Sequence, residues 1–108
     1  MMNNELAGCA ASEPFALRVI GDDMAPEFVD GHIVVVDPAG RVTSGCYVVA
    51  RHGGEVVLRR LRIEDGRYRL AALKEGIAEI ELEALEAIVG VVSQRAGKRR
   101  REHKRYDV

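Results

Sequence analysis

Two adjacent carboxylates, Asp22 and Asp23, are the residues of this chain that most clearly invite a chemical interpretation. They lie in the stretch GDDMAP (residues 21–26), between the apolar runs FALRVI and HIVVVD. A pair of carboxylates can hydrolyse an amide bond when the two groups share one proton across a water molecule. Neighbouring side chains in an extended segment point in opposite directions, however, so this pair is poorly arranged for that chemistry.

Cysteine and histidine do not offer an alternative centre. Cys9 and Cys46 lie far apart without the spacing of a redox or zinc motif, and the three histidines, His32, His52 and His103, share no ligand spacing. The sequence therefore predicts two reduced thiols, no metal ion and no cofactor.

Short apolar strands that alternate with turn signals must position these residues. The apolar runs recur about every 8–12 residues, which is typical of an all-β sandwich or barrel with little helix. HGGE (residues 52–55) and EDGR (residues 64–67) have the composition of tight hairpin turns. We expect strands at residues 16–20, 33–37, 46–51, 56–63, 67–72, 80–82 and 87–93.

Two segments have a weaker helical signal. Residues 25–29 could form one helical turn with Asp23 as its N-cap and Pro26 in the first turn. Residues 78–87 combine helix-forming composition with the alternation of an edge strand, and we favour the strand.

The size and charge of the chain indicate one domain with two different termini. The 108 residues are 47% apolar and contain no Trp, so the core should consist mainly of Val, Leu and Ile. Residues 1–94 carry 9 basic and 15 acidic side chains, whereas residues 95–108 carry 7 basic and 2 acidic ones. We therefore expect a flexible arm at residues 1–13, a folded domain at 14–95 and a basic, disordered tail at 96–108.

The run RVIGDDMAPEFVDGHIVVVD (residues 18–37) resembles the signature of the LexA-like serine–lysine peptidases. This family includes the C-terminal domains of LexA and phage repressors, UmuD and, more distantly, the bacterial signal peptidases. In it, a strand leads into G-D-S-M-x-P, followed by an apolar residue, D-G-D/H and a valine-rich strand. Six residues match position by position: Gly21, Asp22, Met24, Pro26, Asp30 and Gly31.

Three further boxes follow in the order of the family. VTSGCYVVA (residues 42–50) corresponds to V-x-x-G-x-x-V-V-A, GEVVLRRL (54–61) to the hairpin strand G-E-x-x-x-K-R-L, and AIVGVVSQ (87–94) to the closing strand. The resemblance covers about residues 15–94, and several boxes in the right order make it specific. It implies an all-β fold of mainly antiparallel rolled sheets, close to a partial barrel.

Both members of the family's catalytic dyad are replaced in this chain. The nucleophilic serine after G-D corresponds to Asp23, and the lysine of the K-R-L box corresponds to Arg59. A desolvated lysine can be neutral near physiological pH and accept the serine proton, whereas a guanidinium with a pKa above about 12 stays protonated. An aspartate nucleophile would form an acyl anhydride from an amide, which is an uphill step. We therefore expect Asp23 and Arg59 to be vestigial dyad positions.

The paired replacement suggests a structural role for the old site. If the fold keeps these positions in contact, Asp23 and Arg59 form a salt bridge beside the motif residues Gly21, Asp22, Met24 and Pro26. The alternative is that both side chains face solvent and Asp23 only caps the following turn. We favour the salt bridge.

The resemblance implies a catalytically inactive domain that serves as a dimerisation or partner-binding module in transcriptional or SOS-type regulation. Family members dimerise through this domain, and the apolar strand at residues 88–92 is a candidate to contribute. A protein partner would be a repressor, a polymerase or another regulator. The enzyme alternative is a divergent self-cleaving peptidase that cuts at Ala7-Gly8, although this bond lies only 15 residues before Asp23.

The basic tail supports a third interpretation, a small nucleic-acid-binding protein. No aromatic stacking platform accompanies the cations, and a run of like charge is more often a solvated surface. No apolar run is long enough to cross a membrane, so we expect a cytoplasmic protein. The residues that could contact phosphates are Lys98, Arg99, Arg100, Arg101, Lys104 and Arg105.

Overall fold

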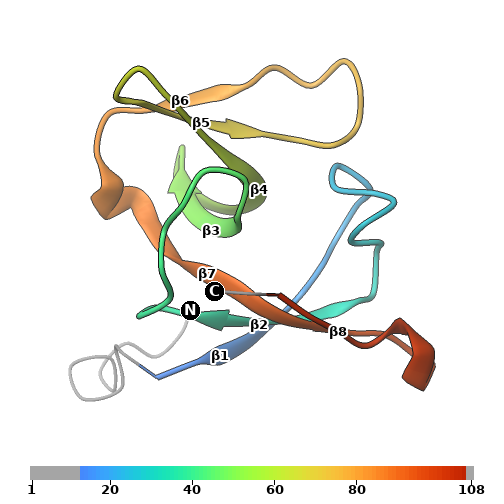
Figure 1. Ribbon diagram of the computed structural model, residues 1–108. Coiled ribbons are helices and arrows are strands. Elements are labelled where there is room, and N and C mark those ends of the chain that lie inside the picture. Colours follow the sequence, from blue (N-terminus) through green and yellow to red (C-terminus); the bar gives the residue numbers. More distant parts are fainter. Residues whose placement is uncertain (1–12, 107–108) are drawn as a thin grey trace.

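The computed structural model describes residues 13–106, so the arm expected at residues 1–13 lies almost entirely outside the described part (Figure 1). Within that part, eight strands form one antiparallel sheet, and two short 3₁₀ helices complete the regular structure. This confirms the predicted all-β fold with little helix. The elements are β1 (Phe15–Arg18), β2 (Ile33–Asp37), β3 (Tyr47–His52), β4 (Glu55–Glu64), β5 (Arg67–Ala71), β6 (Ile80–Leu82), η2 (Leu85–Ala87), β7 (Ile88–Ala96), η3 (Arg100–Glu102) and β8 (Lys104–Arg105).

Strand β7 joins the two halves of the sheet. The strand order is β1-β2-β7-β3-β4-β5-β6, and β8 pairs with the far end of β7. In Figure 1, β1 and β2 lie at one end of the molecule and β5 and β6 at the other, while β7 runs between them. A bulge between Val35 and Val36 adjusts the register of β2 against β7. The contribution of residues 88–92 to self-association stays a prediction; β3 pairs with Ile88, Gly90 and Val91, and β2 pairs with Val91 and Val92.

The two predicted hairpins are present. Gly53 and Gly54 have φ values of +62° and +81° between β3 and β4, and Asp65 and Gly66 have φ values of +51° and +76° between β4 and β5. Positive φ at both central residues is the requirement of a type I′ turn, whose twist matches that of the flanking strands. The residues at the centre of HGGE and EDGR, which adopt positive φ more readily than most, therefore determine these two turns.

Two clusters of buried side chains form the core, and valine and leucine dominate both, as the composition predicts. One lies between the β1-β2 end and the loop that follows β1, and it includes the buried aromatic ring of Phe28. The other lies under β3 to β6. The buried members of the first cluster are Val19, Met24, Phe28, Val34, Val36, Val49 and Val92. Those of the second are Val48, Ala50, Leu61, Leu70, Leu82 and Val91.

The structure corrects two expectations about helix and strand. Residues 78–87 are divided between β6 and the 3₁₀ helix η2, so the predicted strand is right only for its middle part. Residues 25–29 form no regular helix; the segment turns through the hydrogen bonds from Ala25 N to Asp22 O and from Phe28 N to Met24 O. The Ala25-Pro26 peptide bond in this segment is cis.

The expectation of a disordered tail at residues 96–108 is wrong for residues 96–106. Strand β7 continues to Ala96, η3 follows, and β8 returns beside β7 with Arg105 opposite Gln94. The segment folds because the ring of Tyr106 packs on Phe28 and Tyr47, with centroid distances of 5.6 and 5.7 Å. Among residues 13–106, no helix has the length and apolar character needed to cross a bilayer.

Candidate functional site

The loop after β1 is held in place by backbone hydrogen bonds to the chain that returns into β2. Val19 N donates to His32 O and Gly31 N donates to Val19 O, both at 2.8 Å. Gly21, with φ of +90°, donates its N–H to the Asp30 carboxylate at 2.7 Å. The glycine and aspartate residues of the motif thus close the base of the loop, and this fixes where Asp23 lies.

Buried side chains anchor the loop from inside. Met24 and Phe28 are 2% and 0% exposed, whereas Asp22 and Pro26 are exposed. Asp23 lies between the exposed Asp22 and the buried Met24, so its side chain is at the edge of the core. The motif residues therefore gather in one loop, as the sequence predicts, with Met24 held by packing and Gly21, Asp30 and Gly31 by hydrogen bonds.

Residues 73 and 74, which the sequence analysis did not assign to the site, also hold Asp23 in place. The backbone N–H groups of Leu73 and Lys74 both donate to Asp23 O at 3.0 Å. The Lys74 ammonium binds the Asp22 carboxylate at 3.0 and 3.2 Å. The hydrogen bond and the charge of Lys74 lower the pKa of Asp22 below its usual value. Asp22 therefore stays ionised and engaged away from Asp23, and it is not a partner that could share a proton.

Arg59 reaches Asp23 from strand β4. It lies opposite Val48 in the β3–β4 register, and its side chain is 11% exposed against 47% for Asp23. Nη2 donates to Asp23 Oδ2 at 3.2 Å, and Nη1 donates to the carbonyl of Leu58 at 2.8 Å. The Nε atom is buried without a hydrogen-bond partner. The ion pair predicted for these two positions is therefore present, and its cation is the more buried member.

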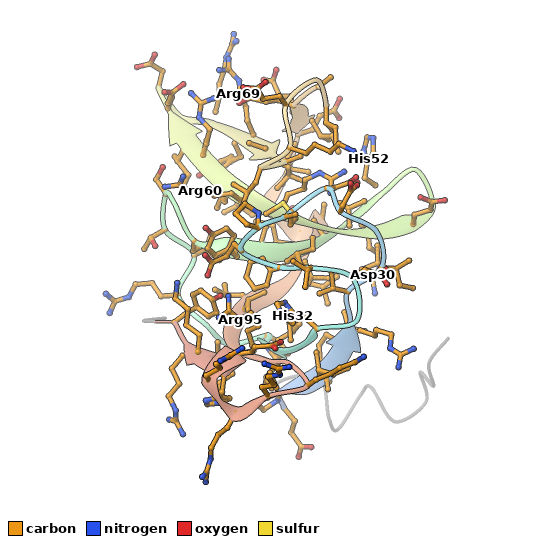
Figure 2. The ribbon with its side chains drawn as sticks, turned by 90° about the vertical axis from the view of Figure 1, so that its right-hand side faces the viewer. Asp30, His32, His52, Arg60, Arg69 and Arg95 are labelled. Atoms are coloured by element: carbon orange, nitrogen blue, oxygen red, sulfur yellow. The ribbon has the colours of Figure 1, made fainter. Side chains whose placement is uncertain are left out.

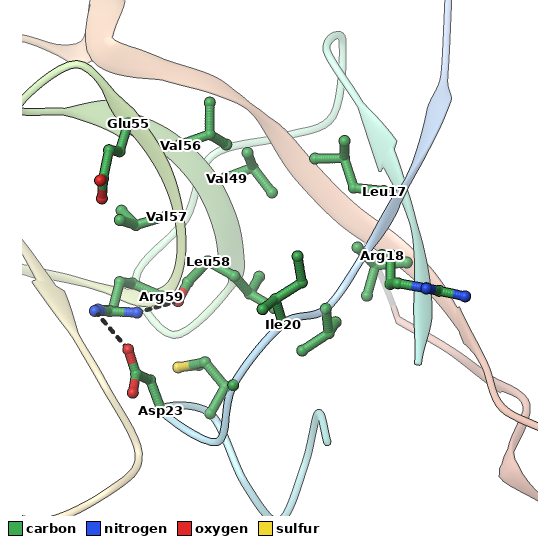
Figure 3. Close-up of a pocket in the computed structure, with 14 residues that line it drawn as sticks. Leu17, Arg18, Ile20, Asp23, Val49, Glu55, Val56, Val57, Leu58 and Arg59 are labelled. Atoms are coloured by element: carbon green, nitrogen blue, oxygen red, sulfur yellow. Dashed lines mark hydrogen bonds and ion pairs between the residues drawn. The ribbon is translucent and has the colours of Figure 1, made fainter. Parts of the chain in front are cut away.

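The ion pair lies at one side of an open cleft of about 420 Å³. Figure 3 shows Asp23 and Arg59 together, with the apolar side chains of Ile20, Leu17 and Val49 across from them. The end of β1, the Asp23 loop and the start of β4 form the walls. Ile20 and Val56 at the rim are 84% and 56% exposed. This arrangement combines an apolar trough, an adjacent edge strand and one fixed charge pair.

Residues 3–93 match the protein-family model described as Peptidase S24-like. The chain belongs to the Peptidase S24-like family. No curated protein matches it in a sequence search. The match covers the cleft, both dyad positions and most of the sheet, so the S24-like fold and the resemblance to LexA-like peptidases agree. Within residues 13–106 of this S24-like chain, no group of three His, Cys, Asp or Glu side chains is arranged to hold a metal ion.

The structure separates the tail cations, which the sequence treats as one set, into two groups. Lys104 is exposed but paired, because its ammonium binds the Glu27 carboxylate at 2.8 Å. Lys98, Arg99, Arg100, Arg101 and Arg105 are exposed. None of these five residues comes near the S24-like cleft, whose lining contains no residue beyond Arg59.

Glu27 is the centre of a polar network that sequence reasoning missed. Its carboxylate accepts hydrogen bonds from Lys104 and from the Tyr106 hydroxyl, and Arg95 donates to the Glu27 carbonyl at 2.7 Å. Burial alone would raise the pKa of Glu27, but the hydrogen bonds from Lys104 and Tyr106 outweigh it and lower that pKa. Burial, together with the hydrogen bond to Glu27, raises the pKa of Tyr106. No local pattern in the sequence signals these contacts, since their members are 68 or more residues apart.

Proposed function

We propose that this S24-like domain is non-catalytic and acts as a partner-binding module. The observation that carries the proposal is the contact between Asp23 and Arg59 at the dyad positions, beside a cleft that remains open. A cleft that keeps its shape but lacks a nucleophile and a base can bind a segment of polypeptide without cutting it.

The chemistry of the pair argues against hydrolysis. Arg59 keeps its proton, so it cannot accept one from a nucleophile. Asp23 would have to attack as a carboxylate while bound to a cation, and the product would be a high-energy anhydride. The route through two carboxylates that share a proton is unsupported as well, because Asp22 is ionised on Lys74.

The cleft has features that suit an extended peptide. Strand β1 is an edge of the sheet among the described residues, and residues 17–20 at its end line the cleft. An added strand would gain main-chain hydrogen bonds, while apolar side chains on the trough would supply selectivity. The exposed Ile20 and Val56 at the rim are the side chains that such a segment would cover.

The setting and the assembly come from the resemblance. LexA, the phage repressors and UmuD place such a domain in transcriptional or SOS-type regulation, and a cytoplasmic homodimer that binds a repressor, a polymerase or another regulator is part of this proposal. A divergent self-cleaving peptidase is the alternative that the first experiment must separate from it.

Restoration of the dyad tests the catalytic part. The intact mass of the natural chain should stay unchanged after incubation at mildly alkaline pH, where a desolvated lysine loses its proton. The double variant Asp23→Ser/Arg59→Lys should then gain self-cleavage if only the dyad is missing. The single variants Asp23→Ser and Arg59→Lys are matched controls and should stay intact. Cleavage of the natural chain near Ala7-Gly8 would contradict the proposal.

Capture from the native cell extract tests the binding part. The double variant Ile20→Glu/Val56→Glu places charges on the cleft rim, and Val42→Glu/Leu85→Glu is a control on two exposed apolar side chains outside the cleft, which are 36% and 42% exposed. A regulator that is retained by the natural chain and the control, but lost by the rim variant, supports a partner in the cleft. Equal capture by all three proteins would contradict it.

A further inference from the structure

We infer that the folded C-terminal segment is a binding surface for the phosphate backbone of a nucleic acid, separate from the cleft. We name it the C-terminal basic surface and define it by Lys98, Arg99, Arg100, Arg101, Arg105 and, on the edge strand β1 of the same sheet, Arg18. The inference does not depend on the function proposed for the cleft.

The segment has a fixed scaffold. Arg95 Nε donates to the carbonyl of Glu102 at 2.8 Å, and Tyr106 N donates to Ser93 O at 2.9 Å. The Tyr106 ring is packed in the aromatic cluster, and its hydroxyl binds Glu27. The cations between these anchors therefore lie on a defined turn and strand. A ligand that binds them has less conformational entropy to overcome than it would with an unstructured tail.

The surface carries cations that the domain leaves unneutralised. Across residues 13–106, no carboxylate lies within salt-bridge distance of its six cations. The two acidic residues that contact or belong to the folded segment have other partners: Glu27, in the loop after β1, binds Lys104 and Tyr106, and Glu102 faces the buried His32 at 3.3 Å. Among the residues that the structure describes, no ion pair relieves the repulsion between these cations, and a polyanion would relieve it.

The strand registers show how the cations are spread. Ala16, Val35, Gln94 and Arg105 follow one another across β1, β2, β7 and β8, so their side chains share one face of the sheet. Arg18, two residues after Ala16, lies on that same face because strand side chains alternate. Neighbouring strands are about 4.8 Å apart and each residue advances about 3.4 Å along a strand, so Arg18 and Arg105 are separated by about three strand spacings and two residues, or roughly 16 Å.

This spacing suits a chain of phosphates. One nucleic-acid strand carries a phosphate about every 3.4 Å along the duplex axis, so roughly 16 Å spans about five of them. Figure 2 shows nitrogen-tipped side chains extending outward around the C-terminal part of the ribbon, near Arg95 and His32. Five of the six cations are arginines, whose planar guanidinium matches the geometry of phosphate oxygens.

The composition of the surface favours a nucleic acid over a lipid membrane. The large apolar side chains that are exposed in the described chain are Ile20, Val29, Val42, Val56 and Leu85, and none belongs to η3 or β8. An interfacial membrane segment would place apolar side chains next to its cations. The surface also has no aromatic platform pointing outward, because Tyr106 is packed inside, so we expect backbone binding without base selectivity.

Fluorescence anisotropy with a labelled duplex DNA of mixed sequence, titrated with the full chain over a range of salt concentrations, tests the inference. Neutralisation of about five phosphates gives a slope of log K against log[salt] of about −4.5 for a duplex. The triple variant Arg99→Gln/Arg100→Gln/Arg101→Gln should reduce the magnitude of that slope by about 2.7. The control Arg41→Gln/Arg51→Gln/Arg60→Gln removes three exposed arginines outside this surface and should leave the slope close to that of the natural chain.

The titrations of the natural chain and of the two triple variants either support the inference or overturn it. Circular dichroism must first show that both triple variants remain folded, and all six replaced side chains are exposed and lie outside the Glu27 network. No binding to the duplex at low salt, or an equal loss in the two variants, would overturn the inference. Binding to vesicles with anionic headgroups, with the same dependence on the three arginines but without affinity for DNA, would overturn it in favour of a membrane surface.

Discussion

Removal of Asp23 should destabilise the domain more than removal of its buried partner. The Arg59 side chain is 11% exposed and has one orphaned nitrogen, whereas Asp23 is 47% exposed. Asp23→Ala leaves a buried guanidinium with only the Leu58 carbonyl as an acceptor. Arg59→Met removes the buried charge, keeps much of the apolar stem, and leaves a carboxylate that water can reach. The two halves of one ion pair therefore have unequal mutational costs.

The magnitudes follow from this uneven burial. Breaking a fully buried pair costs about 3–5 kcal/mol and breaking an exposed one under about 1, so we expect about 2 kcal/mol for Asp23→Ala. A loss of that size lowers Tm by roughly 8–16 °C in a domain of this size. Replacement of a buried ion by an apolar side chain is often nearly neutral, so Arg59→Met should cost under about 1 kcal/mol.

Urea unfolding followed by circular dichroism measures these differences as shifts of the midpoint at constant slope. Asp22→Ala is the matched control, because it removes the neighbouring carboxylate from an exposed pair with Lys74 and should shift the midpoint much less than Asp23→Ala. The double variant Asp23→Ala/Arg59→Met should be about as stable as Arg59→Met alone. If Arg59→Met lowers the free energy of unfolding more than Asp23→Ala does, the explanation that a buried guanidinium depends on an accessible carboxylate is refuted.

Two further predictions concern other parts of the fold. Gly90→Ala should lower the urea midpoint by an amount equivalent to about 1–3 kcal/mol, since its Cβ would lie 2.7 Å from Val36 Cγ1 and 2.9 Å from the Asp37 carbonyl oxygen; an unchanged midpoint would show that the strands separate easily. The Glu27 network should make stability depend on pH. The folded-state pKa of Glu27 is below its ordinary value of 4.5, so its contribution is fully present above that value and is lost as pH falls through the folded-state pKa. Glu27→Gln should therefore flatten the acid limb of a plot of stability against pH, and a slope identical to that of the natural chain would count against the network.

Features that are local in the sequence were predictable. Both type I′ hairpins follow from two or three residues whose backbone preferences dictate the turn. The position of Asp23 relative to Arg59 was predictable for a different reason: the boxes around residues 21–26 and 54–61 resemble those of a known family and occur in its order. The replaced side chains then have complementary charges, and the contact at 3.2 Å follows.

Features that depend on distant partners were not predictable. From sequence alone, the tail resembles a solvated run of charge, because Lys104 and Tyr106 make contacts that stabilise them with Glu27 and Phe28, nearly eighty residues earlier. Lys74 has no motif around it, and its role comes from the return of the chain toward the Asp23 loop. Residues 78–87 have mixed helix and strand preferences, and the short pairing of β6 with β5 decides how the segment is divided.

The central position of β7 has a consequence for how the chain folds during synthesis. Among residues 13–106, the β1–β2 pair and the β3–β6 meander meet in the sheet through β7, which follows all of these strands in the chain and is therefore translated after them. A two-stranded pair is marginal in water, so β1 and β2 have little to pack against until β7 arrives. Tyr106, which follows β7 in the sequence, then completes the cluster around Phe28. The Asp23 loop, although it precedes β7 in the chain, should therefore acquire its final structure only after β7 and Tyr106 have been translated.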